Sequence, residues 1–145
     1  MHRCLIALTA LLIAASVHAE VTVQDPWVRA TVPGQKTSGA FLQLTSSTDA
    51  TLVGARSPVA GIVEIHEMAM DDNMTMRMRA VKAIPLPAGQ AVALKPGGYH
   101  VMLMDLKETM QAGKTVKLTL VVKDGKGELE DVDVEVQVKP LGSKL

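Results

Sequence analysis

Cysteine is nearly absent from this sequence of 145 residues. The single cysteine, Cys4, precedes an apolar run from Leu5 to Ala15 near the N-terminus. Without that segment the chain cannot form a disulfide, so its stability must come from its core. The missing thiol also excludes the His₂Cys ligand set that blue-copper electron-transfer sites use.

Apolar segments that could cross a membrane are lacking after the N-terminus. Residues 1–19 have the parts of a secretory signal peptide: the basic Arg3, an apolar run and the small-residue site Val17-His18-Ala19. We therefore expect cleavage there, leaving residues 20–145 as one exported domain in the periplasm. No later apolar stretch predicts stable membrane insertion. A lipoprotein cysteine would follow the apolar run, whereas Cys4 precedes it, so we expect no lipid anchor.

The charges show no excess of either sign, with 15 Lys and Arg against 15 Asp and Glu. No basic tract predicts nucleic-acid binding, and no acidic block predicts a disordered tail. Enzyme signatures are missing as well, since the sequence has no G-x-S-x-G and no H-E-x-x-H. We therefore expect a protein that is not an enzyme.

No segment has a helical period of useful length, whereas many short stretches have strand signals. Apolar and polar residues alternate most regularly over 116–123 and 131–138, with the turn signal Asp124 to Gly127 between them. The further candidate strands are 27–32, 40–45, 50–55, 62–70, 74–81, 91–94 and 100–106. With one Trp, one Tyr and one Phe, the core must be aliphatic. These features predict an all-β fold, an antiparallel Greek-key sandwich or barrel.

Histidine and methionine are concentrated in one part of the sequence. His2 and His18 fall in the expected signal peptide, which leaves His66 and His100. All eight methionines after Met1 lie between positions 68 and 110. Imidazole and thioether without thiolate are a soft ligand set, which selects Cu(I) over Mg, Ca and Mn. Zinc sites favour Cys, His and carboxylate, so zinc fits this set less well.

The methionine-rich stretch is expected to form a hairpin. A three-residue loop at 71–73 would pair residues whose numbers sum to 144, so that His66 faces Met78. Directly opposed residues have Cβ atoms about 4.5–5.5 Å apart, close enough to share a metal. The same register sets Glu67 against Arg77 on the other face, where they would form an ion pair.

His100 and Met102 are two residues apart, so they point the same way on a strand. The preceding Lys95-Pro96-Gly97-Gly98 fits a type II turn, which places His100 at the start of its strand and near one end of the fold. Our hypothesis is that His66, Met78, His100 and Met102 converge in one Cu(I) site.

Two other interpretations of the methionines stay open at this point. Methionine is a common gap-filler in protein cores, and the face opposite His66 carries Glu67, Arg77 and Arg79, so the methionine face could be the core. A metal-free surface that binds a partner through exposed methionines is the second. Packing and a soft rim around the site are both open for four of the other methionines, Met68, Met70, Met76 and Met104, and Met74 has no assigned role.

At these residues the chain resembles the periplasmic copper chaperone family PCu(A)C, whose motif is H(M)X10MX21HXM. His66 opens the motif, Met78 follows after 11 intervening residues, 21 residues separate Met78 from His100, and Met102 closes it. Glu67 stands where the optional methionine would be. The resemblance extends to the neighbouring segments Val63–Met68, Lys95–Met104, Trp27–Thr31 and Gly39–Phe41.

The resemblance implies a cupredoxin-like β-sandwich that binds Cu(I) through the four matching residues. It also implies delivery of copper toward the CuA centre of cytochrome c oxidase, with oxidase subunit II or a Sco-type protein as the acceptor. A copper storage or resistance protein is the alternative with the same chemistry. A metal-free β-sandwich adaptor with a methionine-lined face is the alternative from another class.

Overall fold

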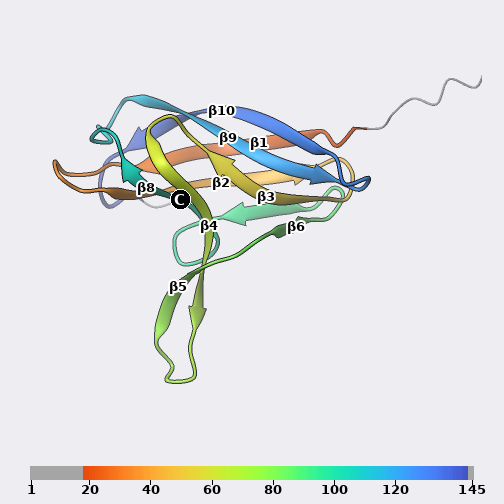
Figure 1. The fold of residues 1–145 in the computed structure, drawn as a ribbon, viewed down its shortest axis with the longest axis horizontal. Helices are drawn as coiled ribbons and strands as arrows, with labels where there is room; N and C mark the ends of the chain where they lie inside the picture. The colour runs from red at the N-terminus through yellow and green to blue at the C-terminus, as the bar shows by residue number, and fades with distance from the viewer. Residues whose placement is uncertain (1–17, 144–145) are drawn as a thin grey trace, which may run out of the picture.

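The chain folds into β-structure with one projecting hairpin (Figure 1). This computed structural model describes residues 18–143, so residues 1–17 of the expected signal peptide lie outside the described part. The strands are β1 (Val21–Arg29), β2 (Thr37–Ser46), β3 (Ala50–Arg56), β4 (Ala60–Met70), β5 (Met76–Ala80), β6 (Ile84–Leu86), β7 (Ala91–Leu94), β8 (His100–Leu106), β9 (Thr115–Asp124) and β10 (Leu129–Lys139). Within residues 18–143 there is no helix with the length and apolar character needed to cross a membrane.

The strands form one sheet in the order β5-β4-β8-β2-β1-β10-β9-β3-β6, with β7 also paired to β2. Strands from distant places in this order share one core, because Leu52 of β3, Ile84 of β6 and Leu103 of β8 are buried in the same cluster. The sheet therefore curls around its core into the expected cupredoxin-like β-sandwich (Figure 1).

One strand pair departs from the antiparallel expectation. β1 and β10 run parallel, with Trp27 opposite Gln137, whereas the other strand pairs of the described part are antiparallel. Alternation of apolar and polar residues tells which face of a strand is buried, but it carries no information about strand direction. The pattern therefore could not have distinguished a parallel pair from an antiparallel one.

The aliphatic core matches the period-2 pattern. On β9, Val116, Leu118, Leu120 and Val122 are all buried, while both lysines of the strand are exposed. The strand β6 was missed because its three residues are too few to show a period.

The hairpin of β4 and β5 positions the candidate site. The first half of β4, from Ala60 to His66, pairs with β8 in the body of the sandwich. The second half, from His66 to Met70, pairs with β5 and projects away from the body (Figure 1). His66 therefore sits at the junction between the sandwich and its projecting arm.

Candidate metal centre

The two histidines outside the expected signal peptide lie side by side. The neighbouring strands β4 and β8 set His66 directly opposite His100, and their ring centroids are 5.8 Å apart. Nitrogen–metal bonds to imidazole are about 2 Å long. Two rings at this separation can therefore each place one nitrogen on a shared ion.

Each imidazole has one ring nitrogen held by an acceptor and one without a partner. His66 Nε2 lies 2.8 Å from a carboxylate oxygen of Glu64, and His100 Nδ1 lies 3.1 Å from the carbonyl oxygen of Gly98. Because both partners accept, these nitrogens donate, and a neutral ring then has a lone pair on the other nitrogen. Those nitrogens, His66 Nδ1 and His100 Nε2, are buried without a hydrogen-bond partner. Metal-binding histidines are oriented in this way by a carboxylate or a carbonyl.

The structure decides which face of these strands is the core. Ile65 and Val101, which point opposite to the histidines, are 3% and 0% exposed and belong to the aliphatic cluster. On the histidine face, Met102 is half-buried and Met78 is 47% exposed. The methionine face is therefore the outer face of the sandwich, and the interpretation that it fills the core is wrong.

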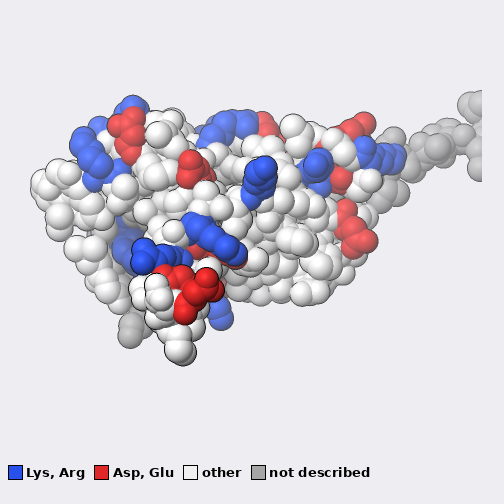
Figure 2. Space-filling view, turned by 60° about the horizontal axis from the view of Figure 1, so that its bottom comes forward, with Lys and Arg blue, Asp and Glu red and all other residues white. Residues whose placement is uncertain are grey.

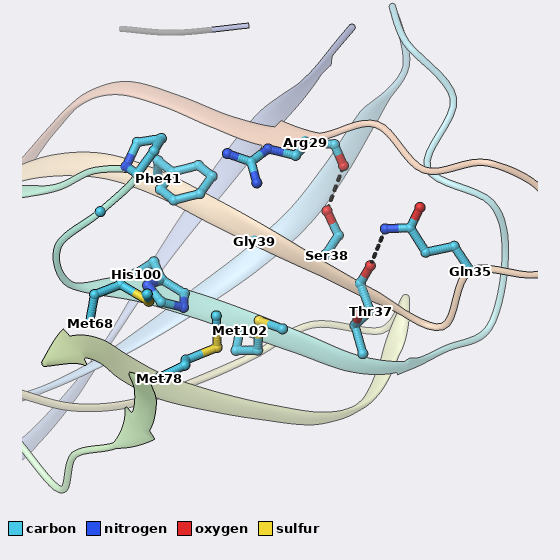
Figure 3. Close-up of a pocket in the computed structure, with 12 residues that line it drawn as sticks. Arg29, Gln35, Thr37, Ser38, Gly39, Phe41, Met68, Met78, His100 and Met102 are labelled. Atoms are coloured by element: carbon cyan, nitrogen blue, oxygen red, sulfur yellow. Dashed lines mark hydrogen bonds between the residues drawn. The ribbon is translucent and has the colours of Figure 1, made fainter. Parts of the chain in front are cut away.

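A pocket of about 250 Å³ opens on this outer face. Met78, His100 and Met102 line it, and so does Met68 (Figure 3). The three methionine side chains gather around the His100 ring (Figure 3). His66 stands beside His100 but is not part of the lining. Three of the four predicted residues thus share the pocket, and the fourth lies against its buried histidine.

The hairpin register differs from the expected one by two residues. His66 faces Ala80, and Met78 faces Met68, so the predicted direct pairing of His66 with Met78 is wrong. The cause is the loop, which spans 72–74 instead of 71–73. Asp71 donates its N–H to the carbonyl of Thr75 and so extends the ladder by one pair.

Local hydrogen bonds explain why the loop starts one residue later. The Asp71 carboxylate accepts the backbone N–H groups of Asn73 at 3.0 Å and Thr75 at 2.9 Å, an arrangement that Asp favours in turns. The same carboxylate binds the Arg77 side chain, which leaves Arg79 as the partner of Glu67 at 2.6 Å. The predicted ion pair of Glu67 with Arg77 is therefore replaced by two ion pairs.

The turn before β8 has the expected geometry. Gly97 has φ 85°, and Gly98 donates its N–H to the Lys95 carbonyl at 2.9 Å, as in a type II turn. The turn returns the Gly98 carbonyl to His100 Nδ1. His100 consequently begins β8 with its ring oriented and 4% of the residue exposed.

Aromatic rings support His100 from the side of β2 and β1. Trp27 and Phe41 are buried outside the aliphatic cluster, with ring centroids 4.6 Å apart. Phe41 lies 6.1 Å from His100 by ring centroids, and the guanidinium carbon of Arg29 lies 5.3 Å from the Phe41 centroid. Phe41 thus lines the pocket beside His100 with Trp27 packed against it, and these rigid rings support the position of His100.

Burial lowers the pKa of His100 below its ordinary value of 6.5. The hydrogen bond to Gly98 acts in the opposite direction, and the neighbouring His66 and Arg29 lower the pKa further. His100 is therefore neutral, with its lone pair free, over a wider pH range than an exposed histidine.

Two residues of this centre have no assigned role in the sequence analysis. The Glu64 carboxylate lies 2.8 Å from His66 Nε2 and orients that ring. Strand parity could have found it, because residues two apart share a face. Met68 was left between packing and rim, and only the two-residue register shift brings it opposite Met78.

Comparison with known proteins identifies a family and a related protein. The model of the family described as "Putative lipoprotein LpqE-like" matches residues 21–138. "Putative lipoprotein Lxx21020" of Leifsonia xyli subsp. xyli is 34% identical over 105 residues, which cover 72% of this chain and 63% of that protein. The chain thus spans less than two thirds of that relative's length.

Two solved structures have similar folds. The solution structure of CuI-DR1885 from Deinococcus radiodurans is 32% identical with a TM-score of 0.62, covering 82% of this chain and 78% of that one. The copper-bound PCuAC domain from PmoF2 is 24% identical with a TM-score of 0.66, covering 86% of this chain and 99% of that one. At that identity the second structure is similar in fold alone.

Proposed function

The chain belongs to the LpqE-like family, which is the PCuAC family, and from this premise we propose that it is an exported Cu(I) chaperone. It binds one Cu(I) ion through His66, Met78, His100 and Met102 and passes it to another protein. The observation that carries the proposal is the pair of opposed histidines, each with one oriented ring nitrogen and one buried nitrogen without a partner.

The donor chemistry supports Cu(I) as the cargo. Two neutral imidazoles and two neutral thioethers would hold Cu(I) in a shell of net charge +1, and soft ligands favour this ion. No thiolate is present in residues 20–145, so an oxidising compartment cannot inactivate the site by forming a disulfide. Met68, opposite Met78 in the same pocket, offers a further sulfur while a ligand leaves.

The open side of the pocket suits transfer. Met78 is 47% exposed, so an acceptor ligand can approach the ion from solvent and replace the thioethers one at a time. A site with thiolates binds copper more strongly than thioethers do. We therefore propose the CuA centre of cytochrome c oxidase subunit II, or a Sco-type protein, as the acceptor.

The compartment follows from the same premise. The family is described as one of lipoprotein-like proteins, which supports an exported protein of the cell envelope. Together with the signal-like residues 1–19, this leads us to propose the periplasm as the place of action.

Anaerobic Cu(I) titration against a competing chelator tests the site. We expect one tightly bound equivalent in the wild type and its loss in His100→Ala and in Met102→Leu, since each removes a ligand. Met102→Leu keeps the side-chain volume, so the unfolding midpoint should stay close to that of the wild type. Met104→Leu is the matched control, because Met104 lies two residues further on the same face of β8 and outside the pocket lining.

Unchanged Cu(I) affinity in both ligand variants would refute the assignment. Absence of any tight equivalent in the wild type would favour the metal-free adaptor. Incubation of the loaded protein with a copper-free CuA domain, followed by separation and metal analysis, distinguishes a chaperone from a storage or resistance protein. A chaperone should lose its copper to the CuA domain, and a storage protein should retain it.

A further inference from the structure

The projecting hairpin exposes methionine well beyond the pocket. Met70, Met74 and Met76 are 59%, 78% and 49% exposed. Exposed apolar surface of this kind, when it is contiguous, usually marks a binding site. Met70 and Met76 are directly opposed, and they lie next to the opposed pair of Met68 and Met78 on the same face. The four methionines thus form two successive cross-strand pairs from the hairpin end toward the pocket.

The loop carries a third methionine in an unfavourable conformation. Met74 has φ 60°, a left-handed backbone that is uncommon for residues other than Gly, Asn and Asp. A three-residue hairpin loop of this type ordinarily has Gly at that position. The turn itself is closed by Asp71 and Thr75, so it does not require a methionine. Strain that persists at an exposed position points to a role for the side chain.

The charges of the hairpin do not oppose a cation on the methionine face. Arg79 is bound to Glu67, and Arg77 is bound to Asp71. In β5 these arginines alternate with the methionines, so they belong to the opposite face. Figure 2 shows acidic and basic groups lying together over the hairpin. Each guanidinium is thus paired with a carboxylate away from the sulfurs.

Resting on the proposed Cu(I) function, we infer that Met70 and Met76, with Met74 beside them, form a second and weaker Cu(I) site at the hairpin end. Thioethers select Cu(I), and opposed strand residues about 4.5–5.5 Å apart at Cβ can place flexible methionine sulfurs on one ion. The site has no imidazole, so it binds less tightly than the pocket. Copper reaches the pocket from it past Met68 and Met78 by ligand exchange, with no change of oxidation state.

The test follows the methyl groups of methionine by NMR during anaerobic addition of Cu(I) to the full domain. With the first equivalent, the methyl signals of Met78 and Met102 should shift. Between one and two equivalents, those of Met70 and Met76 should shift. The double variant Met70→Leu with Met76→Leu should keep the first equivalent at wild-type affinity and lose the second. Leucine preserves apolar surface and volume, so the comparison isolates the sulfur.

Met104→Leu is again the control, because it removes a sulfur outside the hairpin, and it should retain both equivalents. Signals of Met70 and Met76 that stay unmoved up to two equivalents would overturn the inference. A double Leu variant that still takes up the second equivalent would overturn it equally. Failure of the proposed function would instead appear in the first equivalent, as binding that does not respond to His100→Ala.

Discussion

Glu64 offers the sharpest prediction, because it touches the proposed site without being a ligand. Its carboxylate lies 2.8 Å from His66 Nε2 and leaves His66 Nδ1 buried without a partner. Replacement by Ala removes the acceptor, so the ring loses its fixed tautomer and orientation. Removal of such a partner typically weakens metal binding about 10–100-fold. The Glu64 side chain is 46% exposed, so water partly screens its interaction with His66. We therefore expect a loss of Cu(I) affinity at the lower end of that range, about tenfold or about 1.4 kcal/mol.

The assay is competition for Cu(I) with a chelator, combined with ¹⁵N NMR of the copper-free His66 ring. In the wild type Nε2 should carry the proton, whereas in Glu64→Ala the two tautomers should mix. Glu64→Gln retains an oxygen acceptor without the charge and should lie between wild type and Glu64→Ala in affinity. Glu67→Ala is the matched control, because it removes the same charge three residues away, where the carboxylate binds Arg79.

The reasoning would be refuted by a Cu(I) affinity in Glu64→Ala equal to that of the wild type. It would equally be refuted if Glu67→Ala lost as much affinity as Glu64→Ala. The loss would then reflect the charge of the hairpin alone, and the contact with the imidazole would contribute nothing.

Three further perturbations test the packing and the loop. The pKa of His100 is lowered in the folded protein. As the pH falls through the ordinary histidine pKa of 6.5, the unfolded state therefore takes up the proton first, and the free energy of unfolding decreases. Urea unfolding above and below that pH should show this decrease in the wild type and a smaller one in His100→Ala. Gly39→Ala would place a Cβ 2.9 Å from Cζ of Phe41, whose ring packs at a tilt against Trp27, and should lower the free energy of unfolding by about 1–3 kcal/mol. Unchanged stability would show that the ring yields freely. Asp71→Ala removes an acceptor for two backbone N–H groups of the loop. The free energy of local opening should fall by about 1 kcal/mol, which corresponds to about fivefold faster amide exchange in the loop. Equal exchange rates in variant and wild type would contradict the role of this carboxylate in the register.

Much of the fold was accessible from the sequence because strand burial follows a period of two. The alternation over 116–123 and 131–138 predicted β9 and β10, and the aliphatic composition predicted the core. Strand β6 was too short to have a period, and the parallel pairing of β1 with β10 leaves no trace in the alternation. These features depend on which strands meet, and local patterns do not encode that.

At the candidate site too, the sequence pattern predicted which residues share a face, whereas their cross-strand partners depended on the pairing of the strands. A register error of two residues left every side chain on its predicted face, because the period of a strand is also two. Met78 and His66 therefore share one face, as predicted, even though their direct pairing was wrong. An error of one residue would have moved the whole set to the core.

The sequence by itself determined the candidate donors, their softness and which of them share a face of a strand, since these depend on residue type and parity. Only the tertiary structure decided that β4 and β8 are neighbours, which sets His66 against His100 across 33 intervening residues. It also decided that Glu64 and Gly98 orient the two rings and that Met68 joins the pocket. Pairing between strands far apart in the chain depends on how the whole core closes, and no local segment contains that information.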